Sequence, residues 1–414
     1  MKKIVFLFVL AGLWACKNKP QVAVNKIKED VVFLADDKLE GRQTGTEGEE
    51  KASKYLVSRF KEIGLEPKGT DGFLQPFSFK PKTDPHKEVE FSKNSDSTIT
   101  GNNVIGYINN NAETTIIIGA HYDHLGYGGE GSLYRGEEKA VHNGADDNAS
   151  GVAVLLNLAS RLKIKNDQSE IRDKNNYMFL AFSGEEMGLL GSNYFSKNPT
   201  ISAESINYMI NMDMVGRLKN DNTLAVYGVG TSPLFKQTIN SHNEKFKLIE
   251  NESGVGPSDH TSFYLIDVPV LHFFTGQHED YHKPSDDSDK LNYKGMSLIS
   301  DYIFDIISDL DDNGELAFRT TKNESEETPR FKVGLGVVPD YLYDGEGMRI
   351  DGTREDTPAF NAGIQKGDIV IKLGDSMVTD MMSYMRALSI FDNGDEADIT
   401  VLRGDQKIET KVKF

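Results

Sequence analysis

Five side chains that can bind a divalent metal ion stand at points where the chain changes direction. They are His121, Asp146, Glu186, Asp213 and His282. Imidazole nitrogens and carboxylate oxygens are ligands that zinc takes in catalytic sites, where the ion activates water and polarises a carbonyl group. The chain contains a single cysteine, which excludes zinc–thiolate sites, iron–sulfur clusters and an intrachain disulfide. Any metal site is therefore expected to use nitrogen and oxygen ligands.

Two of these candidates lie at a strand end and in a turn. His121 follows the apolar run Thr115–Ile118, and in an extended chain Asp123 projects to the same side as His121. A carboxylate in that place can support the imidazole. Asp146 and Asp147 stand in a polar turn between small residues, directly before a predicted helix whose N-terminus tolerates negative charge. The turn is thus a second source of metal ligands.

The other candidates follow two more apolar runs and a loop. Glu185 and Glu186 come after the run Tyr177–Phe182, and neighbouring glutamates point in different directions, so one can bind a metal ion while the other transfers protons. Asp213 is predicted inside an apolar strand, where an unpaired carboxylate is costly without a cation. His282 lies in a loop. Each motif alone has an ordinary structural explanation, and only their combination indicates a metal centre.

The elements that must position these side chains alternate between strands and helices. Strands are expected at Thr115–Ile118, Tyr177–Phe182 and Val268–Leu271, and helices at Gly151–Lys163 and Gly295–Leu310. The strands are almost continuously apolar, which is typical of strands buried on both faces of a parallel sheet. We therefore predict an α/β fold with a mostly parallel central sheet flanked by helices.

Nearer the N-terminus, the polar stretch Leu39–Gly48 precedes apolar residues at helical spacing that end at Gly64. This pattern predicts a loop followed by an amphipathic helix.

The charge balance limits the partners that the chain can have. Among 414 residues, 46 are Lys or Arg and 64 are Asp or Glu, which gives a net charge of −18. Because binding to a nucleic acid needs a basic surface, no nucleic-acid partner is expected.

In their order along the chain, the five motifs resemble those of peptidase family M28, a family of zinc peptidases with two metal ions. The motifs are Gly-Ala-His-Tyr-Asp-His, Gly-Ala-Asp-Asp-Asn-Ala-Ser-Gly, Gly-Glu-Glu, Asn-Met-Asp-Met and Tyr-His-Lys-Pro-Ser-Asp. The resemblance implies that His121, Asp146 and Asp213 bind one zinc ion. It likewise implies that Asp146, Glu186 and His282 bind the other, so that Asp146 bridges the two ions.

The resemblance also implies roles for residues around the metal ions. Glu185 matches the general base, and Asp123 matches the carboxylate that orients His121. The peptide bond between the two aspartates of the turn is often cis in the family, which here means the bond between Asp146 and Asp147. The remaining histidines are expected to be packing or surface residues. They are His86, His124, His142, His242, His272 and His278.

The activity that follows is that of an exopeptidase acting on peptide substrates, with an aminopeptidase favoured. A hydroxide shared by two Zn²⁺ ions would attack the scissile carbonyl while Glu185 acts as general base, and Co²⁺ or Mn²⁺ could replace zinc in vitro. A carboxypeptidase, a glutaminyl cyclase of the same fold and a non-catalytic peptide-binding adaptor remain alternatives. A carboxypeptidase would need a cation for the substrate carboxylate, for which Arg135 and Arg217 are candidates. The Gly-rich segment Tyr127–His142 either overhangs the pocket or is a solvated loop.

The last part of the chain resembles a PDZ domain, a small and mainly β fold. The stretch Phe331–Val338 resembles the carboxylate-binding loop of these domains, which binds the C-terminus of a peptide or protein ligand. The peptide-binding residues implied are Gly334, Leu335, Gly336 and Val337. Pro339 follows on the strand that should bind the peptide and has no N–H to donate. Peptide binding is therefore expected to be weak or altered, and the domain serves either in substrate delivery or in packing and docking.

The N-terminus has the pattern of an export signal. Lys2 and Lys3 precede the apolar run Ile4–Leu13, which has the length of a signal core and is too short to span a bilayer. The sequence Leu13-Trp14-Ala15-Cys16 resembles a bacterial lipobox, in which Cys16 becomes an acylated first residue. This implies an exported protein with a lipid anchor to a membrane of a bacterial cell envelope, either periplasmic or surface-exposed.

These assignments predict four segments. A signal peptide covers residues 1–15, a metallopeptidase domain 16–318, a polar linker 319–330 and a PDZ-like domain 331–414.

Overall fold

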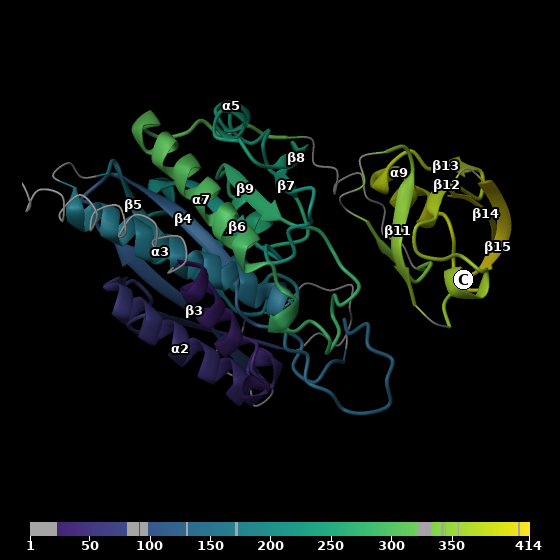
Figure 1. The fold of residues 1–414 in the computed structure, drawn as a ribbon, viewed down its shortest axis with the longest axis horizontal. Coiled ribbons are helices and arrows are strands. Elements are labelled where there is room, and N and C mark those ends of the chain that lie inside the picture. Colours follow the sequence, from purple (N-terminus) through teal and green to yellow (C-terminus); the bar gives the residue numbers. More distant parts are fainter. Residues whose placement is uncertain are drawn as a thin grey trace, which may run out of the picture.

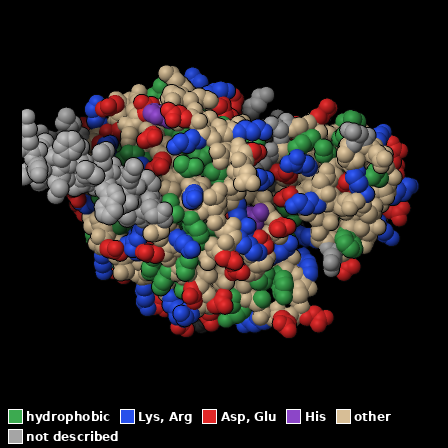
Figure 2. All heavy atoms as spheres, in the orientation of Figure 1, with side chains coloured by type: hydrophobic (Ala, Val, Ile, Leu, Met, Phe, Trp, Pro, Cys, Tyr) green, Lys and Arg blue, Asp and Glu red, His purple; other side chains and the backbone are tan. Residues whose placement is uncertain are grey.

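A computed structural model describes the fold of residues 23–80, 91, 98–129, 131–169, 173–321, 333–340, 343, 345–354, 356–404 and 406–414. The predicted signal peptide, Cys16 and most of the predicted linker lie outside these ranges. Among the described residues, no helix has the length and apolar character needed to cross a bilayer. Figure 2 shows acidic and basic side chains interspersed over the face that it presents.

A nine-stranded sheet forms the centre of the larger domain, in the order β1-β3-β5-β4-β6-β9-β7-β8 with β2 beside β3. The four central strands β5, β4, β6 and β9 are parallel, which confirms the predicted α/β fold. The strands are β1 (Glu66–Pro67), β2 (Leu74–Phe79), β3 (Ile99–Ile108), β4 (Thr114–His121), β5 (Asn175–Phe182), β6 (Ile206–Met212), β7 (Thr223–Tyr227), β8 (Lys247–Asn251) and β9 (Val270–Phe274).

Helices cover both faces of this sheet, and the central strands are buried between them. The helices are α2 (Glu47–Ile63), α3 (Gly151–Gln168), α4 (Leu190–Lys197), α5 (Phe235–Ser241), α6 (His260–Tyr264) and α7 (Tyr293–Leu310). Ile116 and Ile118 of β4 pack with α2, α3 and α7, which lie across one face in Figure 1. Ile117 packs with α4 and α6 on the other face. This alternation explains why the central strands are apolar at nearly every position.

The helix α2 ends before Gly64, as predicted, and begins at Glu47, two residues inside the stretch expected to be a loop. The side chain of Thr46 accepts a hydrogen bond from the backbone N–H of Glu49 at its start. At its end, Gly64 adopts a left-handed conformation with φ of 86°, which glycine adopts without steric cost. Leu56 and Phe60 on its inner face are fully buried. The loop ahead of the helix contains a short 3₁₀ segment, η1 (Asp37–Arg42).

The smaller domain is a six-stranded antiparallel sheet with two helices, in the order β10-β11-β12-β14-β15 with β13 beside β12. It has a hydrophobic core of its own and confirms the predicted compact, mainly β domain. Its elements are β10 (Val337–Pro339), β11 (Met348–Thr353), α8 (Pro358–Asn361), β12 (Ile369–Leu373), β13 (Ser376–Met377), α9 (Met381–Leu388), β14 (Glu396–Arg403) and β15 (Gln406–Lys413).

The first residues of the predicted linker pack on the larger domain. The backbone N–H of Arg319 donates to the carbonyl of Thr231, and the backbone N–H of Thr321 donates to the hydroxyl of Tyr264. The larger domain thus continues through residue 321, three residues beyond the predicted boundary.

Candidate metal centre

The candidate ligands gather at one edge of the sheet because they follow parallel strands. His121 is the last residue of β4, Glu185 and Glu186 follow β5, and Asp213 follows β6. The carboxyl ends of parallel strands meet at the same edge, where α/β folds place their sites. Asp213 was predicted inside a strand, but β6 ends at Met212 and its carboxylate lies just beyond the strand.

A first cluster joins His121, Asp147 and Asp213. The Nε2 atom of His121 lies 3.3 Å from Oδ1 of Asp147 and 3.4 Å from Oδ1 of Asp213. The three side chains are close enough for one ion to contact all of them. His121 and Asp213 are thus brought together as predicted.

A second cluster lies on the other side of Asp147. The Nε2 atom of His282 is 3.2 Å from Oδ2 of Asp147 and 3.2 Å from Oε2 of Glu186. His124 also belongs here, since its Nδ1 atom lies 2.6 Å from Oε1 of Glu186, and His124, Asp147 and Glu186 could hold one ion. The expectation that His124 is a packing or surface residue is wrong, because the turn after β4 directs it at this carboxylate.

The structure contradicts the bridging role predicted for Asp146. Asp147 presents one oxygen to each cluster, whereas Asp146 points away from both. Oδ1 of Asp146 accepts a hydrogen bond of 2.6 Å from the backbone N–H of Gly216, and Oδ2 lies 3.1 Å from Nε2 of His278. His278, expected to be a packing or surface residue, is thus a partner of Asp146. Asp147 therefore replaces Asp146 as the residue common to the two clusters.

The cause is the irregular backbone of the turn. Gly144 has a left-handed conformation with φ of 53°, and Asp147 and Asn148 have non-helical angles. The cis peptide bond joins Asp147 and Asn148, one residue after the predicted position. Two neighbouring aspartates in such a turn face opposite sides, and the sequence alone does not indicate which one faces the metal ions.

The two neighbouring glutamates have opposite protonation preferences. Burial raises the pKa of the Glu185 carboxyl well above its usual value. Burial alone would also raise the pKa of Glu186, but the imidazoles of His282 and His124 outweigh that effect and lower it to about 2. Glu186 is therefore suited to bind a cation and Glu185 to exchange protons. Oε2 of Glu185 lies 4.0 Å from Nε2 of His121, so it borders the first cluster.

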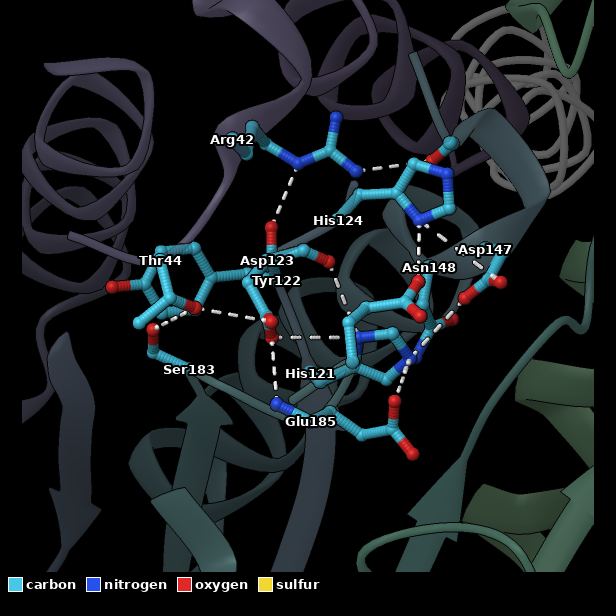
Figure 3. A network of polar contacts seen from close by, with 12 residues as sticks. Arg42, Thr44, His121, Tyr122, Asp123, His124, Asp147, Asn148, Ser183 and Glu185 are labelled. Carbon is cyan, nitrogen blue, oxygen red and sulfur yellow. Dashed lines mark hydrogen bonds and ion pairs between the residues drawn. The ribbon is translucent and has the colours of Figure 1, made fainter. Parts of the chain in front are cut away.

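Asp123 lies behind the first cluster, as predicted. Its Oδ1 atom is 3.6 Å from Nδ1 of His121 and accepts a hydrogen bond of 3.2 Å from the backbone N–H of Glu185. Figure 3 shows Asp123 between these two residues. Ser258 donates a hydrogen bond of 2.8 Å to Oδ2 of Asp213. This hydrogen bond fixes the orientation of Asp213. Asp123 fixes that of His121, whose Nδ1 atom also lies 3.3 Å from the backbone carbonyl oxygen of Asp123.

The segment Tyr127–His142 contacts His282. The Nδ1 atom of His282 lies 2.9 Å from the carbonyl oxygen of Gly131, and the backbone N–H of Leu133 donates to the carbonyl of His282. Because a carbonyl oxygen only accepts, Nδ1 of this imidazole is the donor, so Nε2 is the atom that faces Asp147 and Glu186 and would bind a metal ion. The segment thus supports a candidate ligand, which the sequence did not predict.

The side chains present fit zinc. Nε2 of His121 and Oδ1 of Asp213 are buried and have no hydrogen-bond partner among the described residues, although they lie 3.4 Å apart. Leaving such atoms buried is costly unless a cation satisfies them. Three carboxylates with neutral imidazoles form a donor set that zinc accepts. The chain therefore has two candidate metal sites that share Asp147.

A pocket with a volume of about 110 Å³ opens beside the two clusters. Apart from the residues of the clusters, its lining is largely apolar and aromatic. The lining residues are Asp147, Glu185, Glu186, Asp213, Met214, Tyr227, Pro257, Ser258, His272, Phe274, Gln277, Tyr281 and His282.

Both domains match the models of known protein families. Residues 103–307 match the model of peptidase family M28, and residues 316–414 match the model of the PDZ domain. The first match contains all the residues of the two clusters.

Known proteins share parts of this chain. A probable leucine aminopeptidase of Trichophyton verrucosum is 32% identical over 174 residues, which are 40% of this chain and 44% of that protein. The chain thus covers less than half the length of this relative. An aminopeptidase from Aneurinibacillus sp. strain AM-1 has a similar fold, with a TM-score of 0.53, 20% identity and coverage of 72% of this chain and 95% of that chain. Glutaminyl cyclase from Porphyromonas gingivalis gives a TM-score of 0.53 with 18% identity, covering 70% and 98% of the two chains.

Proposed function

For a chain that carries a peptidase family M28 domain followed by a PDZ domain, we propose a zinc-dependent aminopeptidase with two metal ions. The ions are held by His121, Asp147 and Asp213 on one side and by Asp147, Glu186 and His282 on the other. The aminopeptidase named among the relatives supports this choice.

The observation that carries the aminopeptidase assignment is that the described lining of the pocket contains no lysine or arginine. Among the described residues that line it, four are acidic and none is a lysine or an arginine. These carboxylates would be neutralised by the two zinc ions, so the missing cation decides the assignment: a substrate carboxylate would need a lysine or an arginine, and the described lining contains neither. Neither of the two arginines considered for a carboxypeptidase lines the pocket. Arg217 pairs with Asp280 at 2.7 Å, and Arg135 donates to the carbonyls of Ser132 and Tyr134.

The wall of the pocket limits the first residue of the substrate. Met214, Tyr227, Phe274 and Tyr281 present apolar surface beside the clusters. A volume of about 110 Å³ is below the ~150 Å³ of an engineered apolar cavity that takes benzene. We expect an aliphatic N-terminal side chain to fit best, with the scissile carbonyl at the two clusters.

The residues of the chain then have separate roles in hydrolysis. Zinc, when bound, supplies a Lewis acid that polarises the carbonyl and acidifies water. Glu185 accepts the proton of the attacking water and delivers it to the departing amine. Asp123 holds the backbone of Glu185 and the imidazole of His121 in place. No covalent intermediate with the chain is required.

One peptide in three forms tests the assignment. The purified protein is given the free, the N-acetylated and the C-amidated peptide, with and without chelator, and the products are weighed by mass spectrometry. We expect chelator-sensitive loss of N-terminal residues from the free and amidated forms only. Trimming from the other end that the amide blocks would show a carboxypeptidase and contradict the proposal.

A second peptide with an N-terminal glutamine separates the cyclase alternative. A glutaminyl cyclase would release ammonia and leave the chain length unchanged, whereas an aminopeptidase removes the residue. Two candidate metal sites favour the peptidase, because the cyclase chemistry needs only one zinc ion. Binding without turnover in a protein shown to contain zinc would indicate the adaptor.

We further propose that the PDZ domain contacts a peptide or protein ligand through Gly334–Val337, weakly because of Pro339. The resemblance of the sequence ending at Cys16 to a lipobox supports our proposal that the protein is exported and lipid-anchored to a membrane of a bacterial cell envelope.

A further inference from the structure

The loop Leu39–Gly48 and the start of α2 precede the region that matches the M28 family, residues 103–307, and contribute no candidate metal ligand. The polar side chains of Arg42, Thr44 and Glu49 in this stretch are nevertheless buried. Thr44 is 3% exposed and Glu49 is 2% exposed. Burial of polar groups on this scale is costly unless each has a partner, so their contacts indicate what the segment does.

Thr44 contacts the residue that lies behind the first cluster. Its hydroxyl donates a hydrogen bond of 3.1 Å to Oδ2 of Asp123. The other oxygen of Asp123 is the one that lies near His121 and accepts from the backbone N–H of Glu185. Figure 3 shows Thr44 on the side of Asp123 that faces away from the clusters. The two oxygens of Asp123 are therefore held from opposite sides.

Thr44 is itself held by a buried chain of contacts. Its oxygen lies 3.1 Å from the hydroxyl oxygen of Ser183. Ser183 donates its one proton to Oε1 of Glu49 at 2.6 Å. Thr44 donates its own proton to Asp123, so the two hydroxyls are in contact without a hydrogen bond between them. The second carboxylate oxygen of Glu49 accepts a bond of 2.6 Å from the backbone N–H of Gly45. The methyl group of Thr44 packs where a side chain at Gly101 would be. The rotamer of Thr44 is thus fixed by packing on one side and by polar contacts on the other.

Arg42 connects the same segment to the chain on both sides of the centre. Its guanidinium donates to the carbonyl of Tyr122, which lies between His121 and Asp123, and to the carbonyl of Asn143, just before the turn that contains Asp147. The segment is therefore anchored to the two stretches of backbone that carry the ligands.

From these contacts we propose that Thr44 is a positioning residue of the metal centre. Its hydroxyl fixes the carboxylate of Asp123, and Asp123 in turn aligns the imidazole of His121 and the backbone of Glu185. This inference rests on the proposed function, because it assigns Thr44 a part in holding zinc and orienting the general base.

The test compares variants that differ in the hydroxyl group. Thr44→Val keeps the shape of the side chain and removes the hydroxyl, whereas Thr44→Ser keeps the hydroxyl. Thr115→Val is the matched control, because Thr115 is 2% exposed and lies at the opposite end of β4 from His121. Zinc affinity is measured by competition with a chromogenic chelator, and kcat and KM are measured on a peptide substrate.

We expect Thr44→Val to lower zinc affinity and kcat by ~10- to 100-fold, which is the usual effect of removing a partner of a ligand. KM should change little, because Thr44 does not line the pocket. Thr44→Ser and Thr115→Val should resemble the wild type. Equal zinc affinity and kcat in the Thr44→Val and Thr115→Val variants would overturn the proposal, as would a Thr44→Ser variant as impaired as Thr44→Val.

Two further comparisons keep the outcomes separate. If Thr44→Val does not fold, Thr44→Ser and Thr44→Ala form a pair that both lack the methyl group and differ in the hydroxyl, and equal zinc affinity in this pair overturns the proposal. If the wild type binds no zinc, the proposed function fails. Zinc binding by the wild type that every Thr44 variant retains overturns the positioning role alone.

Discussion

At the scale of single residues, the side chains around Asp147 differ in what they can do although they are chemically similar. Glu185 and Glu186 are neighbours in the chain, yet the pKa of one is raised by burial and that of the other is lowered by imidazoles. Asp146 and Asp147 are also neighbours, and only Asp147 faces the clusters. The roles therefore come from the environment of each carboxylate and not from its type.

Replacing Glu185 with glutamine separates proton transfer from metal binding. The amide has the same shape but cannot accept a proton, so we expect turnover to fall by at least ~100-fold while the zinc content stays near that of the wild type. The measurement is kcat together with metal analysis of the same sample. A mild loss of kcat at full zinc content would remove Glu185 from the role of general base.

The raised pKa of Glu185 predicts the direction of the pH dependence. A protonated carboxyl cannot accept a proton from water, so kcat should increase with pH as Glu185 ionises. Because burial raises this pKa, the acid limb should lie above pH ~4.3, the ordinary value for glutamate. The profile is measured with the zinc content checked at each pH. Full activity that persists below this pH would contradict the prediction.

At the scale of elements, the sequence predicts the strands and helices better than the turns between them. The runs at Thr115–Ile118 and Tyr177–Phe182 lie within β4 and β5 because strands buried on both faces must be apolar throughout. In the turn before α3, the role common to both clusters was assigned to Asp146 instead of Asp147. The two residues are of the same type, and only the backbone angles of the turn distinguish them. His124 was missed because it lies in the turn after β4, where the spacing from His121 along the chain does not show which way a side chain points.

Likewise, the contacts of Thr44 and Arg42 were beyond sequence reasoning. They join residues about 80 to 140 positions apart, and no local pattern contains such pairs.

The prediction for peptide binding by the smaller domain is based on the N–H groups of strand β10. The backbone N–H of Arg354 donates to the carbonyl of Gly336, and Val338 lies opposite Gly352. Since successive residues of a strand face opposite edges, Val337 and Pro339 face the edge away from β11. A peptide that adds at that edge can accept a hydrogen bond from the N–H of Val337 but not from Pro339, which has no N–H.

Replacing Pro339 with valine should therefore strengthen the binding of a peptide with a free C-terminal carboxylate. One added hydrogen bond is worth ~0.5–1.5 kcal/mol, so we expect a ~2- to 10-fold lower Kd. Fluorescence anisotropy on the full chain measures it, with the C-amidated peptide as the control that should not bind. Tight, low-micromolar binding by the unchanged chain would contradict the role given to Pro339.

At the scale of the whole molecule, the domain that contains the two clusters and the smaller domain that matches the PDZ family have separate hydrophobic cores on one chain. We expect the N-terminal segment to bring both to a membrane surface through an acyl group on Cys16. The net charge of −18 gives no attraction to acidic lipids, so retention at the membrane should depend on the lipid alone.

Substituting Cys16 with serine tests this anchor. In a bacterial host we expect the wild type in the membrane fraction with a lipid-modified N-terminus, and the Cys16→Ser variant without the lipid. Mass spectrometry of the N-terminal peptide and fractionation measure the two properties. A wild-type protein that is recovered unacylated from the soluble fraction would contradict the prediction.

The most direct test of a two-zinc centre built on Asp147 is the number of zinc ions bound per chain after equilibrium dialysis at one fixed zinc concentration. It compares the wild type with Asp147→Asn and Asp146→Asn. We expect two ions in the wild type, because two clusters share Asp147, and two in Asp146→Asn, because Asp146 bonds to Gly216 and His278 instead. Asp147→Asn should lose at least one ion. Loss of zinc in Asp146→Asn with two ions kept in Asp147→Asn would contradict the account.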